Sequence, residues 1–274
     1  GHNWARTVVT VPAYYHSGQV EATLSAAREA GLPEPLHCRE PDAAALCYGI
    51  ETTMGENPQT AMAIDLGAGT LDITVGAMIR DGDGYPTFQQ VTAAVGDGAL
   101  GGIDMDDTIL HAVLQNPGLA PLLGLYQKLL HLEPLAGRDF EYFRSLQDLR
   151  DDVERAKIRL SDSPFVDIPL PIGAGVIRLA RSRLEVPDAA DTDGCLYLDE
   201  LLGDPRWVVQ SPGGSRQPVL DRFRSHLRYV LDRYFGGNAA AIQRLILVGG
   251  PMNMPLIRQV IGEELKDSPA VEDL

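Results

Sequence analysis

The chain has few cysteines, and no two of them have the spacing of a C-x-x-C motif. Only Cys38, Cys47 and Cys195 occur among 274 residues, and none lies in a C-x-x-C pair. An odd number without that spacing argues against a disulfide framework and against a zinc site. Because such a sequence suits a reducing compartment, we expect a cytoplasmic protein.

Positive charge and long apolar runs are also scarce. Lys and Arg number 23 against 38 Asp and Glu, which gives a formal net charge of −15. A chain of this charge cannot form a large basic surface, so we expect no nucleic acid and no anionic membrane among its partners. No apolar run approaches the roughly 20 residues that cross a bilayer.

The remaining composition is that of a folded protein. Apolar residues make up 45% of the chain, and 28 Gly and 19 Pro indicate many tight turns. This composition excludes wholesale disorder. The chain starts with Gly-His-Asn rather than Met. We interpret this start as a cloning scar before an internal position, and we expect a piece of a longer protein.

Hydrophobic periodicity and turn residues predict strands and helices in alternation. Strands are expected at 7–11, 36–38, 61–66, 71–79, 87–95, 165–172, 176–180 and 245–248. A first helix is expected after the N-cap Ser17 and is stopped by Gly31. Further helices are expected at 42–48, 104–114, 140–160, 220–235 and 255–265, with Gly49 ending the first of these. Residues 187–217 are rich in Asp, Gly, Pro and Ser and predict an irregular segment. Hairpins mixed with strand–helix steps indicate an α/β fold with a mixed sheet.

The sharpest motif occupies residues 63–73. A strand ends at Asp65, the turn Gly67-Ala68-Gly69-Thr70 follows, and Asp72 lies in the next strand. Glycine amides and a threonine hydroxyl can bind phosphate, and two carboxylates can order water around Mg²⁺. A dinucleotide-binding turn would lead into a helix, whereas this turn leads into a strand. An ordinary β-turn is the alternative.

A second glycine-rich segment runs from residue 96 to 104 and contains Gly101 and Gly102 just before a predicted helix. Amides at a helix start can bind phosphate. A plain flexible loop explains the same composition.

A third segment places Gly249 and Gly250 between a predicted strand and a helix that starts at Pro255. Bare backbone at such a turn allows a flat ring to pack against it. A tight strand–helix turn with close packing is the alternative.

Two further groups of polar residues lie on or near predicted helices. Glu154, Lys157 and Ser161 share a helical face and could contact a ribose or a base, or could simply face solvent. Glu40 precedes a predicted helix. Its carboxylate could orient an attacking water, or could be favoured there by the helix dipole.

Six segments together resemble one family in their order and spacing. The resemblance is to the ATPase domain of the 70-kDa heat-shock (DnaK-like) chaperones, within the actin-like ATPase superfamily. The segments are VVTVPAYY at 8–15, EPDAAALCYG at 40–49, DLGAGTLD at 65–72, LGGID at 100–104, ERAKIRLS at 154–161 and LVGG at 247–250. The resemblance covers nearly the whole chain except about 187–217.

The resemblance implies an actin-like ATPase (ribonuclease-H-like) fold, in which mixed sheets have flanking helices. The chain would hold part of lobe I and nearly all of lobe II, without the first phosphate hairpin, the subdomain with a catalytic Lys, or the C-terminal parts. The implied divisions are 1–55 (later part of lobe I), 56–96 (first part of the lobe II core), 97–186 (smaller lobe II subdomain), 187–217 (irregular insertion) and 218–274 (second part of the core).

The resemblance also implies a role for each matching residue. The expected catalytic residues are Glu40, Asp65, Thr70 and Asp72, with Asp65 and Asp72 ordering the waters of Mg²⁺. The expected ATP or ADP contacts are Gly67, Ala68, Gly69, Thr70, Gly101, Gly102, Glu154, Lys157, Ser161, Gly249 and Gly250.

The intact protein would then hydrolyse MgATP with an oriented water. Phosphoryl transfer needs charge stabilised from both sides, so this piece alone would be almost inactive. A client polypeptide or a co-chaperone would act through the missing domains.

Two other functions stay open. A nucleotide-regulated or nucleotide-dead binding module is favoured by four departures from the family pattern, Ala68, Ile103, Pro251 and Asn253. An actin-like sugar kinase would need an acid in lobe I that binds a substrate hydroxyl.

Overall fold

The computed structural model describes residues 6–51, 57–186, 194–209 and 217–273. The chain separates into two compact units. Unit 1 comprises Gly1–Gly98, His226–Gly249 and Ile261–Leu274, and unit 2 comprises Ala99–Ser225 and Gly250–Val260. The predicted separation of residues 1–55 from 56–96 stays a prediction.

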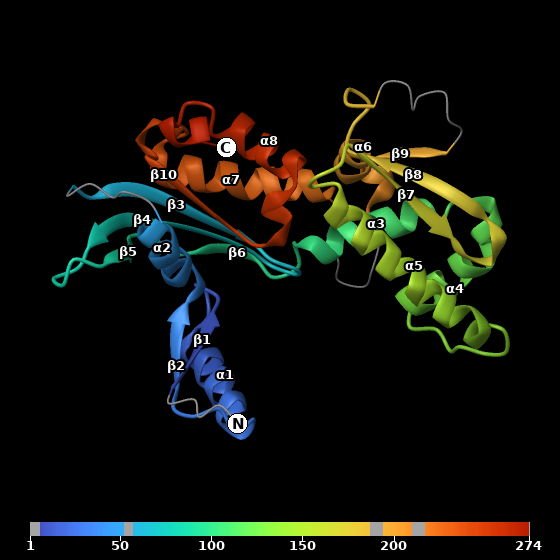
Figure 1. Cartoon of the computed structure of the whole chain (residues 1–274), viewed down its shortest axis with the longest axis horizontal. Coiled ribbons are helices and arrows are strands. Elements are labelled where there is room, and N and C mark those ends of the chain that lie inside the picture. The colour runs from blue at the N-terminus through green and yellow to red at the C-terminus, as the bar shows by residue number, and fades with distance from the viewer. Residues whose placement is uncertain (1–5, 52–56, 187–193, 210–216, 274) are drawn as a thin grey trace. The chain divides into compact units, whose positions relative to one another are not determined.

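Unit 1 begins with a strand–helix–strand segment (Figure 1). Strands β1 (Thr7–Val11) and β2 (Pro35–Arg39) pair in parallel, and α1 (Ser17–Glu29) connects them. The prediction of Ser17 as the N-cap is wrong, because Ser17 is the first residue of the helix and His16 is the capping residue. The backbone N–H of His16 donates to Oε1 of Gln19 over 3.1 Å. Gly31 has φ +81°, a conformation that glycine adopts without steric cost, and the chain turns there as predicted.

Helix α2 (Glu40–Glu51) begins earlier and ends later than the sequence predicted. Pro41 occupies its second position, where the missing N–H breaks no helical hydrogen bond. The expectation that Gly49 ends this helix is wrong, because α2 continues through it. A single glycine in a helix costs only about 1 kcal/mol, which packing elsewhere in the helix can offset.

The main sheet of unit 1 has the strand order β10-β3-β4-β5, and β6 also pairs with β4. The strands are β3 (Gln59–Leu66), β4 (Leu71–Arg80), β5 (Pro86–Gln90), β6 (Val95–Asp97) and β10 (Arg244–Val248). Only β10 and β3 run parallel. The predicted return strand 87–95 is therefore two strands, which pair with different parts of β4.

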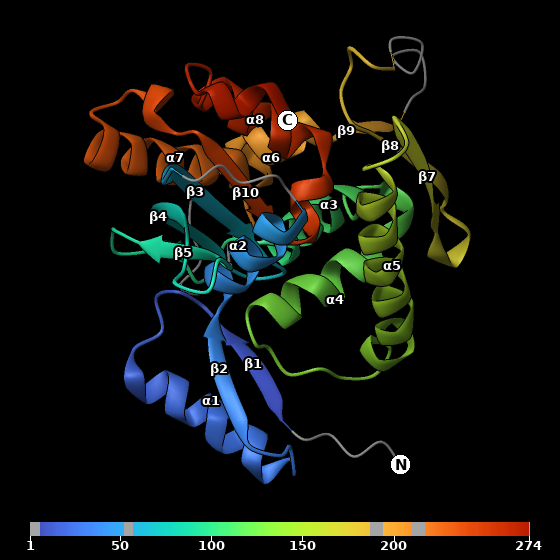
Figure 2. The same ribbon diagram turned by 60° about the vertical axis from the view of Figure 1, so that its left-hand side comes forward.

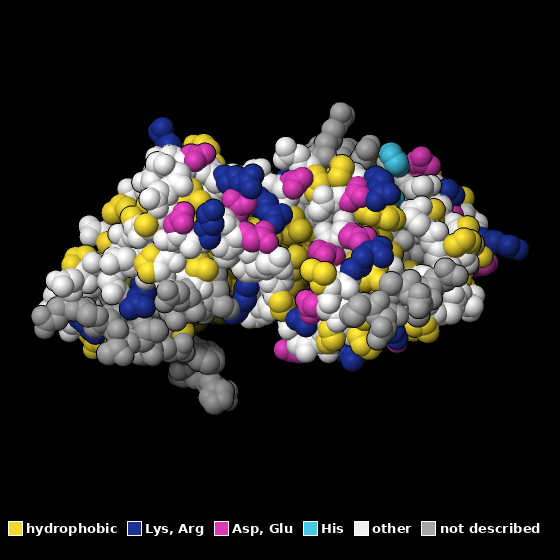
Figure 3. All heavy atoms as spheres, turned by 90° about the horizontal axis from the view of Figure 1, so that it is seen from above, with side chains coloured by type: hydrophobic (Ala, Val, Ile, Leu, Met, Phe, Trp, Pro, Cys, Tyr) yellow, Lys and Arg dark blue, Asp and Glu magenta, His cyan; other side chains and the backbone are white. Residues whose placement is uncertain are grey.

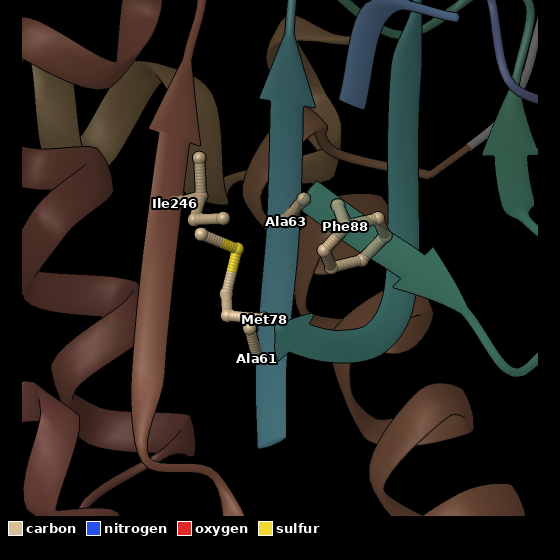
Figure 4. Packing of buried hydrophobic residues seen from close by; sticks show 5 residues of the cluster. All are labelled: Ala61, Ala63, Met78, Phe88 and Ile246. Carbon is tan, nitrogen blue, oxygen red and sulfur yellow. The ribbon is translucent and has the colours of Figure 1, made fainter. Parts of the chain in front are cut away.

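One face of this sheet carries a hydrophobic core, which α2 covers. Alternate residues of a strand share a face, which brings together side chains from four strands (Figure 4). These are Ala61, Ala63, Met78, Phe88 and Ile246. Ala44 of α2 packs against them. A Cβ at Gly76 would lie 2.5 Å from Cζ of Phe88, so the ring needs a glycine beside it.

Unit 2 combines helices with a small sheet (Figure 2). Its helices are α3 (Gly102–Val113), α4 (Ala120–Leu130), α5 (Asp139–Arg159) and the short α6 (Leu198–Gly203). Its strands β7 (Phe165–Leu170), β8 (Gly175–Ala180) and β9 (Cys195–Tyr197) form a sheet in that order. The β7–β8 hairpin is antiparallel as predicted, and α5 packs against α3, α4 and β7.

Two regions of unit 2 differ from the sequence predictions. Helix α4 was not expected, because Pro121 and Gly124 lie inside it, but Pro121 is in the first turn, and Leu122 and Leu125 bury one face. Within the range 187–217, the described residues 194–209 form β9 and α6, so the irregular prediction is wrong there. Residues 187–193 and 210–216 lie outside the described residues.

Helices α7 (Val219–Phe235) and α8 (Pro255–Glu264) lie close to their predicted ranges, and a 3-10 helix at Pro269–Asp273 follows them. In unit 1, Arg228 of α7 donates two hydrogen bonds to Glu264 of α8, both of 2.7 Å. The mixed α/β fold with flanking helices is thus confirmed.

The surface mixes both signs of charge. On the face shown in Figure 3, acidic and basic side chains are interspersed rather than gathered by sign. Among the described helices, none combines the length and the apolar character that a membrane crossing requires.

Candidate functional site

Two carboxylates meet at the end of the β3–β4 hairpin in unit 1. Asp65 and Asp72 lie directly opposite each other in the antiparallel register. The turn between the strands is closed by the backbone N–H of Gly67, which donates to the carbonyl of Thr70 over 2.9 Å. The structure therefore brings together the two aspartates and the turn that the motif singled out.

Burial and like charge act together on this pair. The side chain of Asp72 is buried, with only 4% of the residue exposed, and its Oδ1 has no hydrogen-bond partner among the described residues. Burial, together with the negative charges of Asp65 and Glu40, raises the pKa of Asp72 to about 7. Burial likewise raises the pKa of Asp65. A cation at this point would relieve both effects.

Glu40 is the first residue of α2, and its carboxylate belongs to the same acidic group. Burial raises its pKa, and the charge of Asp65 raises it further. A helix start stabilises negative charge, so the alternative reading of Glu40 as a dipole-favoured residue is compatible with its position. Its electrostatic effect on Asp72 places it near the two aspartates.

The hairpin turn has open space next to its glycines, and packing within the protein does not require glycine there. A Cβ at Gly69 would meet no atom within 4 Å, and a Cβ at Gly67 would meet only Thr70, at an ordinary 3.6 Å. Neither glycine has a φ in the left-handed region. Ala68 is exposed, so a small side chain stands at the tip of the turn. The glycines therefore leave room for a ligand beside the carboxylates.

Gly249 also belongs to unit 1, and close backbone packing requires a glycine at this position. It follows β10, whose last residue Val248 lies opposite Asp65. A Cβ at Gly249 would lie 2.0 Å from the carbonyl oxygen of Leu66 and 3.2 Å from Oδ1 of Asp65, and its φ is +98°. The close-packing alternative thus holds for Gly249, and its contact with a nucleotide stays a prediction.

In unit 2, Gly101 and Gly102 form the start of α3. Both glycines are buried, and the N–H of Gly101 donates to Oδ2 of Asp104 over 2.8 Å. Ile103, the second residue of the helix, is 52% exposed. Gly250 lies in unit 2 at the start of a short 3-10 helix, and a Cβ there would meet nothing within 4 Å.

The three residues expected on α5 lie in different environments. Glu154 is exposed and Lys157 is buried. Ser161 lies beyond the last residue of α5, Arg159, so the shared helical face extends only to the first two. The ammonium of Lys157 donates to Oδ2 of Asp106 over 2.6 Å and to the carbonyl of Gly102 over 2.8 Å.

Sequence reasoning assigned no role to two residues that adjoin these groups. The ring of Tyr14 lies beside Gly96, since a Cβ at Gly96 would be 3.1 Å from both Tyr14 Cδ1 and Asp72 Oδ1. Burial raises the pKa of Tyr14, as does the charge of Asp72. Asp106 holds the Lys157 ammonium. Tyr14 stood inside a family segment, whereas nothing distinguished Asp106 from its acidic neighbours.

The donor set of unit 1 fits a hydrated metal ion better than a directly coordinated one. In the part of the chain that the structure describes, no group of three or more His, Cys, Asp and Glu is arranged to hold a metal. Mg²⁺ usually keeps several waters and uses one or two carboxylates. Asp65 and Asp72, with the unpartnered Asp72 Oδ1, match that requirement.

Comparison with known proteins identifies relatives along the chain. A family model described as "Hsp70 protein" matches residues 1–177. The "Chaperone protein DnaK" of Elusimicrobium minutum is 33% identical over 257 residues, which cover 93% of this chain and 35% of that relative. The protein of the same name from Thermus thermophilus is 32% identical over 269 residues, which cover 98% of this chain and 37% of the relative. The chain thus spans little more than a third of the length of these relatives.

Proposed function

The chain belongs to the Hsp70 family, and from this premise we propose that the Asp65–Asp72 hairpin binds the phosphates of MgATP for hydrolysis in the full-length protein. The observation that carries the proposal is the buried Asp72 oxygen, which has no partner among the described residues and lies among negative charges. Such a carboxylate calls for a cation that the described residues do not supply.

The chain's own residues supply the other parts of the site. Mg²⁺, when bound, places positive charge beside the phosphate oxygens. Asp65 and Asp72, which lie opposite each other across the hairpin, would hold the waters of that ion. The turn offers backbone amides and the Thr70 hydroxyl as donors to phosphate, with room at Gly69 for close approach.

Glu40 is the candidate for orienting the attacking water. Its pKa is raised by burial and by Asp65, which makes its carboxylate a better proton acceptor than an exposed glutamate. Glu40 is the first residue of α2, so the helix fixes its backbone and its side chain starts from a defined position.

We also propose nucleotide contacts for the glycines and polar residues of the family segments at 100–104, 154–161 and 247–250. They are Gly101, Gly102, Glu154, Lys157 and Ser161, together with Gly249 and Gly250. A cytoplasmic location and a client polypeptide or co-chaperone partner belong to the same proposal, with the partner bound through other parts of the full-length protein.

A second candidate is a nucleotide-regulated or nucleotide-dead binding module. Three of the four departures from the family pattern, Ala68, Ile103 and Asn253, are exposed. None of them carries a charge that could bind phosphate. These positions favour weaker nucleotide binding than the hairpin alone would suggest.

The experiment compares Asp72, which lies next to the β3–β4 turn, with Asp83, which lies on the β4–β5 turn of the same sheet. In the full-length protein, Asp72→Asn is expected to lower ATP turnover about 100-fold or more and to weaken MgADP binding in calorimetry. The matched control Asp83→Asn removes an exposed aspartate on the β4–β5 turn and is expected to change neither.

A second matched pair tests the open space at the turn. Gly69 and Gly82 each have no atom within 4 Å of a Cβ and no left-handed φ. Gly69→Val is expected to block nucleotide, and Gly82→Val is expected to have no effect. Binding without turnover in the unaltered protein would support the second candidate. The absence of both would overturn the ATPase proposal.

A further inference from the structure

We propose that Asp106 is a positioning residue, which acts through Lys157 to hold the Gly102 peptide in the orientation that a phosphate-binding turn needs. This inference rests on the proposed function, because it assigns a task to the glycine turn at the start of α3. Neither the motif spacing nor the family resemblance assigned a role to Asp106.

The contacts form a closed arrangement between two helices of unit 2. The Lys157 ammonium, from α5, donates to Oδ2 of Asp106 over 2.6 Å and to the carbonyl of Gly102 over 2.8 Å. Gly102 and Asp106 are four residues apart on α3 and therefore share a helical face. One ammonium thus bridges the first residue of α3 to a carboxylate one turn further along.

Burial makes this arrangement specific rather than incidental. Asp106 and Lys157 are each 7% exposed, so neither group can exchange its partner for bulk water. Buried ion pairs contribute little net stability, but each partner is costly to leave alone. Such a pair holds its groups in place because every alternative arrangement leaves a buried charge unmatched.

The hydrogen bond from Lys157 adds to the helical geometry of α3 in fixing the direction of one backbone amide. In a trans peptide the C=O and the following N–H point in opposite directions within one plane. The Gly102 carbonyl is held by Lys157, so the N–H of Ile103 is directed the other way. This N–H lies in the first turn of α3, where amides lack helical acceptors and can donate to an anion.

Glycine offers little resistance to rotation of this peptide, so a restraint beyond the terminal hydrogen bonds of α3 matters here. Gly101 and Gly102 have no Cβ to limit their φ and ψ. The N–H of Gly101 is already restrained by Oδ2 of Asp104. Asp106 and Lys157 supply the restraint on the other side of the turn.

A direct role for Lys157 predicts a different result. If Asp106 serves only to orient the Lys157 ammonium for the nucleotide contact proposed above, losing the carboxylate changes the binding of adenosine and ADP alike. If Asp106 acts through the Gly102 peptide, the phosphates of ADP are affected and adenosine is spared. The two nucleoside probes therefore separate positioning from direct contact.

The experiment uses neighbouring aspartates of α3 in the full-length protein. Asp106→Asn removes the charge that holds Lys157. The control Asp107→Asn removes a carboxylate that pairs with Arg150, also on α5. We expect Asp106→Asn to weaken MgADP binding about tenfold, the effect of one charge-assisted hydrogen bond, and to leave adenosine binding within about twofold. The control is expected to leave both unchanged.

Each result decides the matter. Absence of MgADP binding in the unaltered protein would overturn the proposed function and this inference with it. Normal MgADP binding by Asp106→Asn, or equal weakening of ADP and adenosine, would overturn this inference alone. Should Asp106→Asn fail to fold, Asp106→Glu keeps the charge and Lys157 but displaces the carboxylate by one methylene. Selective weakening of ADP binding is expected there too, and unchanged binding would overturn the inference.

Discussion

Asp72 in unit 1 and Asp106 in unit 2 are buried to a similar degree, but their neighbours carry opposite charge. They are 4% and 7% exposed, and each has an Oδ1 without a partner among the described residues. The pKa of Asp72 is raised to about 7 and that of Asp106 to about 6, and burial is the largest cause in both cases. The negative charges near Asp72 contribute to its rise, whereas Lys157 opposes the rise at Asp106.

The difference separates a binding site from an internal support. In unit 2 the positive charge is built into the protein, so the Asp106 carboxylate is already engaged. In unit 1 the neighbours of Asp72 repel it, so the stabilising charge has to come from a ligand. A buried aspartate alone would not reveal which case applies.

The largest expected effect is on the pH dependence of stability in unit 1. The pKa of Asp72 is raised from 3.8 to about 7 in the folded protein, so the folded state binds more protons than the unfolded state between these values. The free energy of unfolding therefore falls as pH rises from 4 to 7, by no more than about 4 kcal/mol, and levels off above 7. Asp72→Asn should flatten this slope.

Urea unfolding at several pH values, without Mg²⁺ or nucleotide, measures the slope. The control Asp83→Asn should keep it, because that exposed side chain lies on another turn. An Asp72→Asn slope as steep as that of the unaltered protein would show that Asp72 is not electrostatically strained.

A smaller effect is expected in unit 2 from removing its built-in cation. Lys157→Met leaves the Asp106 carboxylate buried without its partner, which should lower the free energy of unfolding by about 3 kcal/mol at pH 8. At pH 5, below the raised pKa of Asp106, the carboxyl is largely protonated and the loss should be smaller. Urea unfolding at the two pH values checks this, and equal losses would contradict it.

The smallest effect on stability is expected for an exposed ion pair, which serves as the baseline for the two buried aspartates. Asp167 lies on the surface, where the Arg178 hydrogen bond lowers its pKa. Solvent screens this pair, so Asp167→Asn should shift the thermal unfolding midpoint by no more than about 2 °C. A shift as large as that of Lys157→Met would remove the contrast between exposed and buried pairs. Differential scanning calorimetry of the two variants makes the comparison.

Much of the local structure could be predicted from short stretches of sequence. An apolar strand before the 67–70 turn and alternation after it predicted the hairpin that opposes Asp65 and Asp72. Helix α4 was not predicted; it contains Pro121 and Gly124, whose helix preference is low, and burial of Leu122 and Leu125 stabilises it. Gly49 was predicted to end its helix, but the preference of a single glycine against helix is weak, and α2 continues through it.

The candidate site, too, was partly predictable from the sequence and partly visible only in the structure. The six family segments pointed to the glycines and carboxylates of the hairpin, and the family assignment is confirmed. Which charge each aspartate meets could not be read from the chain, because Lys157 and Asp106 come from different helices. The absence of a partner for Asp72 Oδ1 among the described residues was equally invisible.

The amino-acid order alone determined the hairpin motif, most strands and helices, and membership of the Hsp70 family. These depend on hydrophobic period, turn chemistry and motif order within short windows. Only the tertiary structure decided that Asp72 lies among like charges while Asp106 meets a lysine. The pKa of a carboxyl depends on burial and on charges within a few ångströms, and those neighbours come from distant parts of the chain.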